Sequence, residues 1–113
     1  MNPNLILNEL NQFTGTGTYY RTLNPDIVFT DGVKYLAEKC HCFWLIDVIV
    51  SYQPNPEEFQ VWELKKEGST CTIKMQDGNK NYKIKQFIEY TDFPLNAIVI
   101  WFTNNVIYLP SEH

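Results

Sequence analysis

The chain has 113 residues, which is too short for two ordinary domains. Of these residues 44% are hydrophobic and 15% aromatic, which is enough for one core. Charged residues make up 19%, which excludes a disordered chain, and the net charge of −4 argues against general binding to nucleic acid. We therefore expect residues 1–113 to fold as a single domain.

The sequence also indicates the cellular compartment in which we expect the protein. The longest apolar stretch, Phe43 to Val50, is interrupted by Asp47 and falls short of the roughly 20 residues that span a membrane. The first residues lack the positive charges that begin a secretory signal. Cys40, Cys42 and Cys71 are an odd number of cysteines, and the first two are too close for an easy mutual disulfide. We expect reduced thiols, a cytoplasmic location and no contact with membranes.

The N-terminal segment is predicted to begin with a helix. Asn2 is a suitable N-cap, and Pro3 fits the first helical position, where no N–H group is needed. A stripe of apolar residues follows at helical spacing: Ile6, Leu7, Leu10 and Phe13. Residues 14–17 end the helix, residues 18–23 are typical of a strand, and residues 27–29 suit a short extended stretch.

Residues 31–41 have the clearest helical pattern in the chain. Thr30 or Asp31 can cap the free N–H groups of this helix. Its core-facing stripe has the spacing i, i+3, i+4 and i+7 and consists of Val33, Leu36, Ala37 and Cys40. Residues 43–53 are ambiguous, because their apolar residues fit either a buried helix or a strand covered on both faces. We favour a helix, which Pro54 would end.

The second half has the pattern of an antiparallel sheet, with strands predicted at residues 59–66, 70–76, 82–90, 97–103 and 106–109. Asp77-Gly78 suits a two-residue hairpin loop. Such a loop would pair Ile73 with Tyr82 and Cys71 with Ile84 on the apolar face. The polar face of the hairpin would then carry Thr72, Lys74, Asn81 and Lys83.

Residues 97–103 are apolar at both parities, which is typical of an inner strand covered on both sides. Together the elements predict an α+β fold. We expect an antiparallel β-meander of about five strands, with two or three helices from the N-terminal half packed on one face.

The sequence contains no motif of a common catalytic or cofactor site. Cys40, His41 and Cys42, with Cys71 and His113, supply ligand atoms for zinc, but their spacing differs from that of structural zinc sites. A Cys–His nucleophile pair would need an exposed thiolate, whereas these cysteines fall at predicted core positions. Hydrolase elbows, phosphate-binding glycine loops and metalloprotease motifs are absent. We therefore expect no metal, no cofactor and no catalytic residue.

Asp47 is the most unusual acidic residue, because it interrupts an apolar run. In an apolar pocket its carboxyl group would serve as a general acid or base, although on a helix it can simply face water. One hypothesis therefore places a small-molecule pocket or a small active site near Asp47, His41 and the aromatic residues Trp44, Trp62 and Tyr90.

Charge is unevenly distributed along the chain. From Lys65 to Lys85, six lysines and two acidic residues give +4, whereas the remainder carries −8. Lys74, Lys83 and Lys85 are predicted to project from one face of the hairpin, where they can meet an acidic partner or simply keep the sheet soluble. We expect no aromatic residues interleaved on that face, which weakens the hypothesis of nucleic-acid binding.

Six short segments follow one another in a distinctive order: FTGTGTYYR (13–21), FTDG (29–32), WLID (44–47), FQVW (59–62), DGN (77–79) and YTDFP (90–94). In this order they resemble a family of small uncharacterised bacterial and phage- or plasmid-borne proteins. The resemblance covers nearly the whole chain and implies an accessory gene of the kind carried by mobile elements. Because that family has no assigned activity, it implies no catalytic or binding residue.

The leading hypothesis is a non-enzymatic accessory protein that binds another protein. It rests on the charge asymmetry and on the strand at 97–103, whose second face needs cover from a partner or a second copy. The alternatives are a pocket near Asp47 and, more weakly, nucleic-acid binding through the lysine-rich hairpin. Across these hypotheses the candidate ligand- or partner-binding residues are Asp47, His41, Trp62, Lys74, Lys83 and Lys85.

Overall fold

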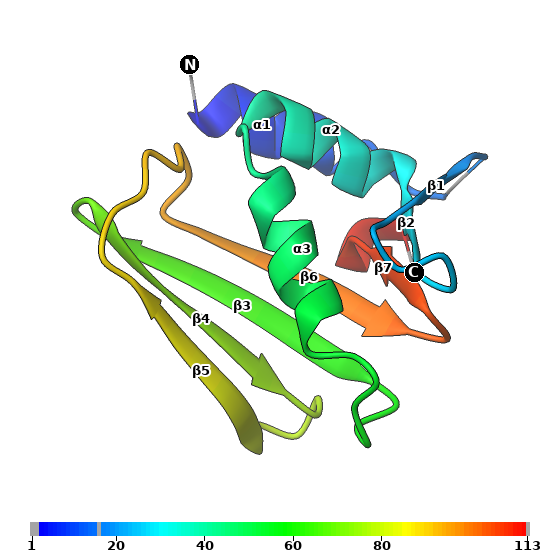
Figure 1. Cartoon of the computed structure of the whole chain (residues 1–113). Helices are drawn as coiled ribbons and strands as arrows, with labels where there is room; N and C mark the ends of the chain where they lie inside the picture. The colour runs from blue at the N-terminus through cyan, green and yellow to red at the C-terminus, as the bar shows by residue number, and fades with distance from the viewer. Residues whose placement is uncertain (1–2, 16, 113) are drawn as a thin grey trace.

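The computed structural model describes residues 3–15 and 17–112 of the chain. Within these residues it contains three α-helices, seven strands and a short 3₁₀ helix (Figure 1). In chain order they are α1 (Pro3–Leu10), β1 (Tyr19–Arg21), β2 (Val28–Thr30), α2 (Asp31–Lys39), α3 (Phe43–Ser51), β3 (Gln60–Glu67), β4 (Thr70–Gln76), β5 (Tyr82–Ile88), β6 (Ala97–Thr103), β7 (Val106–Tyr108) and η1 (Pro110–Glu112). Among the described residues, none of the helices has the length and apolarity needed to cross a membrane.

The strands form one sheet in the order β1-β2-β7-β6-β3-β4-β5. Neighbouring strands are antiparallel, except for β2 and β7, which are parallel. The α+β class is confirmed, but the predicted meander is wrong in two respects. β6 pairs with β3 and not with its chain neighbour β5, and β1 and β2 extend the sheet beyond β7. An apolar strand such as β6 suits a central position, because neighbouring strands then cover both of its edges.

The helix predicted at residues 31–41 is α2, which ends at Lys39. Its N-cap is Thr30, whose side-chain oxygen accepts a hydrogen bond from the Val33 N–H group at 3.4 Å. Val33, Leu36 and Ala37 are buried, so the stripe that predicts the helix is also the stripe that packs in the core.

The ambiguous segment at residues 43–53 is helical, as favoured from the sequence: it forms α3. Leu45, Ile46 and Ile49 of this helix are buried, whereas Asp47 is exposed. The apolar residues at both odd and even positions of this segment therefore belong to a helix that packs in the core. The single acidic residue lies on the side of the helix that faces solvent.

The first helix, α1, ends at Leu10, earlier than its apolar stripe suggests. Phe13 lies beyond the helix, where its ring packs against the ring of Tyr35 with the centroids 5.4 Å apart. The predicted N-cap, Asn2, lies outside the described residues.

The hairpin of β4 and β5 differs from its prediction, because the connecting loop is longer than two residues. The Asp77 carboxylate accepts hydrogen bonds from the backbone N–H groups of Asn79 at 2.8 Å and Asn81 at 3.3 Å, and this holds residues 77–81 as one wide turn. Ile73 therefore pairs with Gln86, and the predicted pairing of Ile73 with Tyr82 is wrong.

The change in register also moves side chains between the two faces of the hairpin. A bulge at Met75 and Gln76 pairs Tyr82 with Gln76. Cys71 pairs with Ile88, not with Ile84, although both isoleucines lie on the apolar face with Cys71. Tyr82 thereby leaves the apolar face on which the two-residue loop would have put it.

Alternate residues along the strands point toward the helices or away from them. On the helix side, Trp62, Leu64, Ile73, Met75 and Ile100 are buried and form the centre of the core. The three helices all lie on this side (Figure 1). We call the opposite side the outer face; it consists of Val61, Glu63, Lys65 and Glu67 of β3 and of the residues of β4, β5 and β6 aligned with them.

The outer face is covered at the Trp101 end of the sheet, where Val61 and Gln76 are also buried. There, Trp101 lies between Phe59 and Tyr108, with ring centroids 5.4 and 6.0 Å apart. Toward the other end of the strand, Val99 keeps 38% of its surface exposed. The prediction that residues 97–103 are covered on both sides therefore holds for the Trp101 end of the strand and not for the Val99 end.

Candidate functional site

Two rows of laterally paired residues form the centre of the outer face. The first row runs across four strands, from β6 to β5, and consists of Val99, Glu63, Lys74 and Lys85. The second row crosses the same strands and consists of Ala97, Lys65, Thr72 and Phe87. Directly paired side chains on a sheet are roughly 5 Å apart at their Cβ atoms, so each charged group in these rows has a charged or apolar neighbour within reach.

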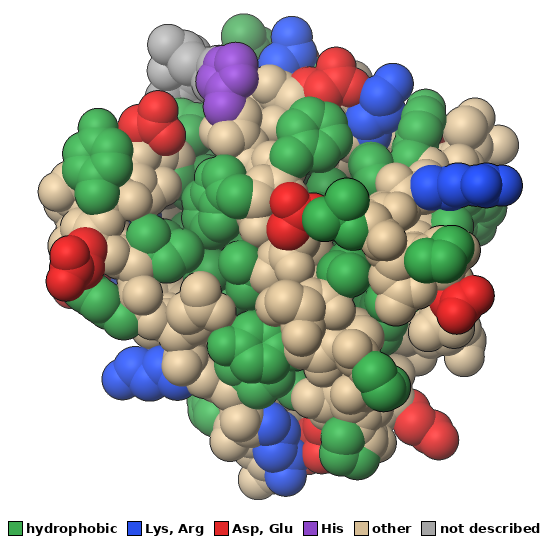
Figure 2. Space-filling view, in the orientation of Figure 1, with side chains coloured by type: hydrophobic (Ala, Val, Ile, Leu, Met, Phe, Trp, Pro, Cys, Tyr) green, Lys and Arg blue, Asp and Glu red, His purple; other side chains and the backbone are tan. Residues whose placement is uncertain are grey.

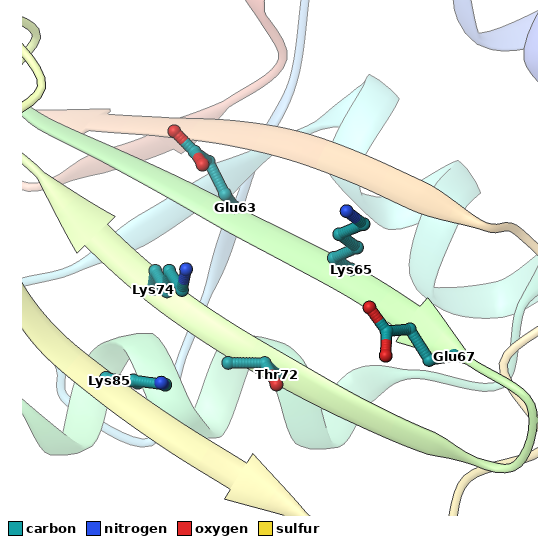
Figure 3. A pocket seen from close by; sticks show the side chains of 6 residues that line it. All are labelled: Glu63, Lys65, Glu67, Thr72, Lys74 and Lys85. Atoms are coloured by element: carbon teal, nitrogen blue, oxygen red, sulfur yellow. The ribbon is translucent and has the colours of Figure 1, made fainter.

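The two rows border a hollow of about 290 Å³ on the sheet surface. It is lined by Glu63, Lys65, Glu67, Thr72, Lys74 and Lys85. Figure 3 shows these side chains standing out from the three neighbouring strands β3, β4 and β5, with the helices behind the sheet. The hollow combines three ammonium groups with two carboxylates, a mixture that complements a protein surface bearing both charge signs.

One corner of the outer face is held in place by hydrogen bonds. The Glu63 carboxylate accepts hydrogen bonds from the side-chain amide of Gln76 and from the Tyr82 hydroxyl group, the latter at 3.1 Å. The hydrogen bond to Glu63 raises the pKa of the Tyr82 hydroxyl group, so Tyr82 stays protonated and remains a donor. The Lys74 ammonium group lies 5.4 Å from the centre of the Tyr82 ring. These contacts restrict the orientations of the carboxylate and the ring.

Apolar side chains are exposed among these charges. Phe87 is 60% exposed, Tyr82 50% and Val99 38%. The register places all three on the outer face, where Tyr82 and Phe87 alternate with Lys74 and Lys85. The expectation that no aromatic residues are interleaved with the lysines is therefore wrong, because the bulge in the hairpin turns Tyr82 to the side of the lysines.

The lysines that give residues 65–85 their positive charge do not form one basic patch. The Lys66 ammonium group donates a hydrogen bond to the Phe93 carbonyl group at 2.6 Å, and that of Lys83 lies 3.6 Å from a carboxylate oxygen of Glu57. Lys65, Lys74 and Lys85 line the hollow together with Glu63 and Glu67. The positive charge of residues 65–85 is thus divided among separate places on the fold, and part of it lies beside carboxylates of other segments.

The helix-bearing side presents a different surface. Figure 2, drawn in the orientation of Figure 1, shows Lys, Arg, Asp and Glu side chains placed mostly singly among apolar and neutral ones. In this view no continuous area of one charge sign is present.

The residues proposed for a pocket near Asp47 differ in their surroundings. Asp47 is exposed on α3, and His41 is exposed between α2 and α3 with a φ of 51°. Trp62 is only 2% exposed, and its indole N–H group donates a hydrogen bond to the Gln60 side-chain oxygen at 2.9 Å. Its burial and this hydrogen bond show that Trp62 is a structural residue of the core.

Two members of that set do share a second hollow, of about 250 Å³. Trp44 of α3 and Tyr90, which follows β5, line it with Ile88, Thr91 and Asp92. Tyr90 is 74% exposed. This hollow combines two aromatic side chains with one carboxyl-bearing residue, which is a favourable environment for a small cation.

The cysteine thiols are buried within the fold. The hydrogen bond with Cys40 and burial together raise the pKa of the Cys42 thiol, and burial raises that of Cys71. The same hydrogen bond lowers the pKa of the Cys40 thiol, but Cys40 is only 2% exposed. A substrate therefore has no access to these three thiols in this conformation.

Within residues 3–15 and 17–112, no three His, Cys, Asp or Glu side chains are grouped as a metal ion would require. His113, which the sequence offers as a possible ligand or base, lies outside the described residues.

Sequence reasoning missed Glu63, Val99 and Phe87 as members of the outer face. The alternation of Glu63, Lys65 and Glu67 along β3 is a visible signal of a solvent-facing strand side. Their position beside the lysines of the hairpin depends on the pairing of β3 with β4 and β6, which no local pattern specifies.

The fold and the outer face define an α+β protein whose helices cover one side of a mixed sheet and whose other side is open and charged. The chain belongs to DUF6876, a family of unknown function, whose model matches residues 4–113. No curated protein and no solved structure was found to match it.

Proposed function

We propose that the chain is a non-enzymatic accessory protein that binds another protein through the outer face of β3, β4, β5 and β6. The observation that carries the proposal is the hollow of charged side chains bordered by exposed Val99, Tyr82 and Phe87, on a side of the sheet without helices. Exposed apolar side chains surrounded by polar ones are typical of protein-binding surfaces.

Charge favours a protein partner over nucleic acid. Binding to a phosphate backbone depends on an excess of Lys and Arg, whereas the hollow has three lysines against Glu63 and Glu67, in a chain of net charge −4. Tyr82 and Phe87 provide rings on which bases can stack, so binding to single-stranded oligonucleotides at low salt is the direct comparison. An affinity that falls steeply with salt and is lost in Lys74→Glu would contradict the protein-binding proposal.

The test uses Val99, because it is apolar, exposed and opposite Glu63. Val99→Lys places a cation beside Glu63, which preserves the sheet, and puts charge where a partner's apolar groups would pack. The matched control is Leu23→Lys, since Leu23 is an apolar residue that is 81% exposed and lies outside the outer face.

Each form would be used to recover partners from cells that carry the gene, and the recovered protein would then be titrated in purified form. We expect the wild type and Leu23→Lys to bind the same protein and Val99→Lys to bind it at least about tenfold more weakly. Equal binding by all three forms would show that the outer face is not the interface. The implied position of the gene on a mobile element is part of the proposal and is checked by sequencing its genomic neighbourhood.

A second candidate function, small-molecule binding, is favoured by the hollow that Trp44 and Tyr90 line with Asp92. The aromatic rings and the carboxylate select for a small organic cation. Titration with tetramethylammonium, followed by NMR, is expected to shift the signals of Trp44 and Tyr90, and Tyr90→Leu is expected to abolish the shifts. Unchanged spectra at saturating cation would exclude this candidate.

A further inference from the structure

The sheet ends in two edge strands of different character. β1 has three residues, Tyr19–Arg21, whereas β5 has seven, Tyr82–Ile88. Among the described strands β5 pairs only with β4, so every second residue of β5 directs its backbone N–H and C=O groups away from the sheet. An edge of this length can form backbone hydrogen bonds along the whole of one more strand.

Lysines on edge strands often prevent such pairing. Here Lys83 is paired with Glu57 of its own chain at 3.6 Å. Lys85 and Glu89 take part in neither of the two ion pairs that the described residues form, Lys34–Glu38 and Lys83–Glu57. Between Lys85 and Glu89 stands Phe87, of which 60% is exposed.

These residues make β5, together with Glu89 directly after it, complementary to a second copy of the same segment. In an antiparallel pair of two β5 strands, each residue lies opposite a residue whose side chain points to the same face of the sheet. The two-fold axis that relates the two copies therefore lies at one residue, which pairs with its own copy. An axis through Lys85 would bring two lysines together, which is unfavourable. An axis through Phe87 pairs the two phenylalanine rings. It sets Lys85 of each copy opposite Glu89 of the other, where Glu89 is exposed in the bend that directly follows Ile88, the last residue of β5.

We infer that the partner at the β5 edge is a second copy of this chain, paired antiparallel about Phe87, with an ion pair between Lys85 and Glu89 at each end of the contact. This inference rests on the proposed protein-binding function and assigns one partner to one edge of the same surface. Helices of both copies would lie on one side of a continuous sheet, and the two outer faces would join on the other side.

The first test exchanges the charges of the pair. The wild type is expected to dimerise with a micromolar dissociation constant in sedimentation equilibrium, because the contact is small. Lys85→Glu and Glu89→Lys each convert two attractive contacts into repulsive ones, so each is expected to raise the dissociation constant about tenfold or more. The double variant Lys85→Glu/Glu89→Lys restores opposite charges and is expected to restore the dimer.

The second test reports the position of the two-fold axis. Phe87→Cys places two thiols opposite each other, and the native cysteines are buried, so mild oxidation of a dilute sample is expected to yield a disulfide-linked dimer. Leu23→Cys is the control for random collision, because Leu23 is 81% exposed and distant from the edge in the strand order.

A wild type that remains monomeric at several hundred micromolar would overturn the inference, as would a dimer that is insensitive to the charge exchange. Neither result would affect the proposed function, because the test with Val99→Lys measures a different partner at a different strand. Loss of the recovered partner in Val99→Lys together with a monomeric wild type would leave the proposed function intact and reject the second copy.

Discussion

Glu112 shows how a single side chain near the end of the chain fixes the beginning of a helix. One carboxylate oxygen accepts hydrogen bonds from the Thr30 hydroxyl group at 2.6 Å and from the Leu109 N–H group at 2.9 Å, and the other accepts one from the Gly32 N–H group at 3.2 Å. A carboxylate near the N-terminus of α2 also interacts favourably with the helix dipole. These contacts leave no room for a side chain at position 32.

The first prediction concerns that close approach. A Cβ atom added at Gly32 would lie 2.7 Å from Glu112 Oε1 and 2.7 Å from Leu109 Cδ1, so Gly32→Ala must displace the carboxylate or the leucine. We expect a loss of about 1–3 kcal/mol in the free energy of unfolding, measured by urea denaturation. Gly15→Ala is the control, because a Cβ atom there meets nothing within 4 Å. Equal stability of the two variants would contradict the described packing.

The second prediction concerns pH. Hydrogen bonds from the Asn81 side chain, then from the Asn79 backbone, lower the pKa of Asp77 below its usual value. A carboxyl group with a lowered pKa in the folded state contributes stability above the pKa of the unfolded state, and this contribution is lost as the pH falls through the folded-state pKa. Asp77→Ala is therefore expected to be less stable than the wild type at pH 7, with the difference shrinking below about pH 4. Urea unfolding across this range is the measurement, and a difference that does not vary with pH would contradict it.

At the scale of elements, buried amides join the end of α3 to the start of β3. Gln53 and Gln60 exchange hydrogen bonds between their side chains at 2.8 and 3.1 Å, and Gln60 is fully buried. The Gln60 oxygen also accepts the indole N–H group of Trp62 at 2.9 Å. The loop between helix and strand is thus fixed by a satisfied polar network inside the core.

The third prediction follows from this network. Gln60→Ala leaves the Trp62 indole and the Gln53 amide without these partners, and we expect it to lower the free energy of unfolding by about 1–3 kcal/mol. Gln12→Ala, at an exposed position, is the control and should change the stability by less than about 0.5 kcal/mol. Thermal unfolding of both variants is the measurement, and an unchanged melting temperature in Gln60→Ala would show that the network does not stabilise the fold.

The elements themselves were largely predictable, because their signals are local. Thr30 as a cap and the stripe in residues 31–41 identify α2, and the apolar run at residues 43–53 corresponds to α3. The hairpin register was not predictable from Asp77-Gly78, because the hydrogen bonds of the Asp77 side chain widen the turn and a bulge absorbs the extra residues. The wide turn and the bulge together therefore decide which face Tyr82 occupies.

At the scale of the whole molecule, the two sides of the sheet differ in what they bury. Ile100 and Val99 are neighbours in β6, yet Ile100 is 1% exposed on the helix side and Val99 is 38% exposed on the outer face. The helices thus stabilise one side only. The open side is available for a partner without cost to the core.

The fourth prediction concerns this difference in burial between the two sides of the sheet. Ile100→Ala removes buried methyl groups and leaves a cavity, so we expect a loss of about 2–5 kcal/mol in the free energy of unfolding. Val99→Ala removes a smaller, half-exposed side chain and is expected to cost under about 1.5 kcal/mol. Guanidinium denaturation of the two variants is the measurement, and equal losses would contradict the assignment of the two faces.

The sequence by itself determined the α+β class and the positions of nearly all helices and strands, because capping, periodicity and turn chemistry act over a few residues. It also showed the apolar character of residues 97–103, although not their neighbours. Only the tertiary structure decided that β6 lies beside β3, that β2 runs parallel to β7, and that Glu63 stands among the lysines of the outer face. These arrangements depend on contacts between segments far apart in the chain, whose energies come from the mutual fit of whole surfaces and leave no local pattern to read.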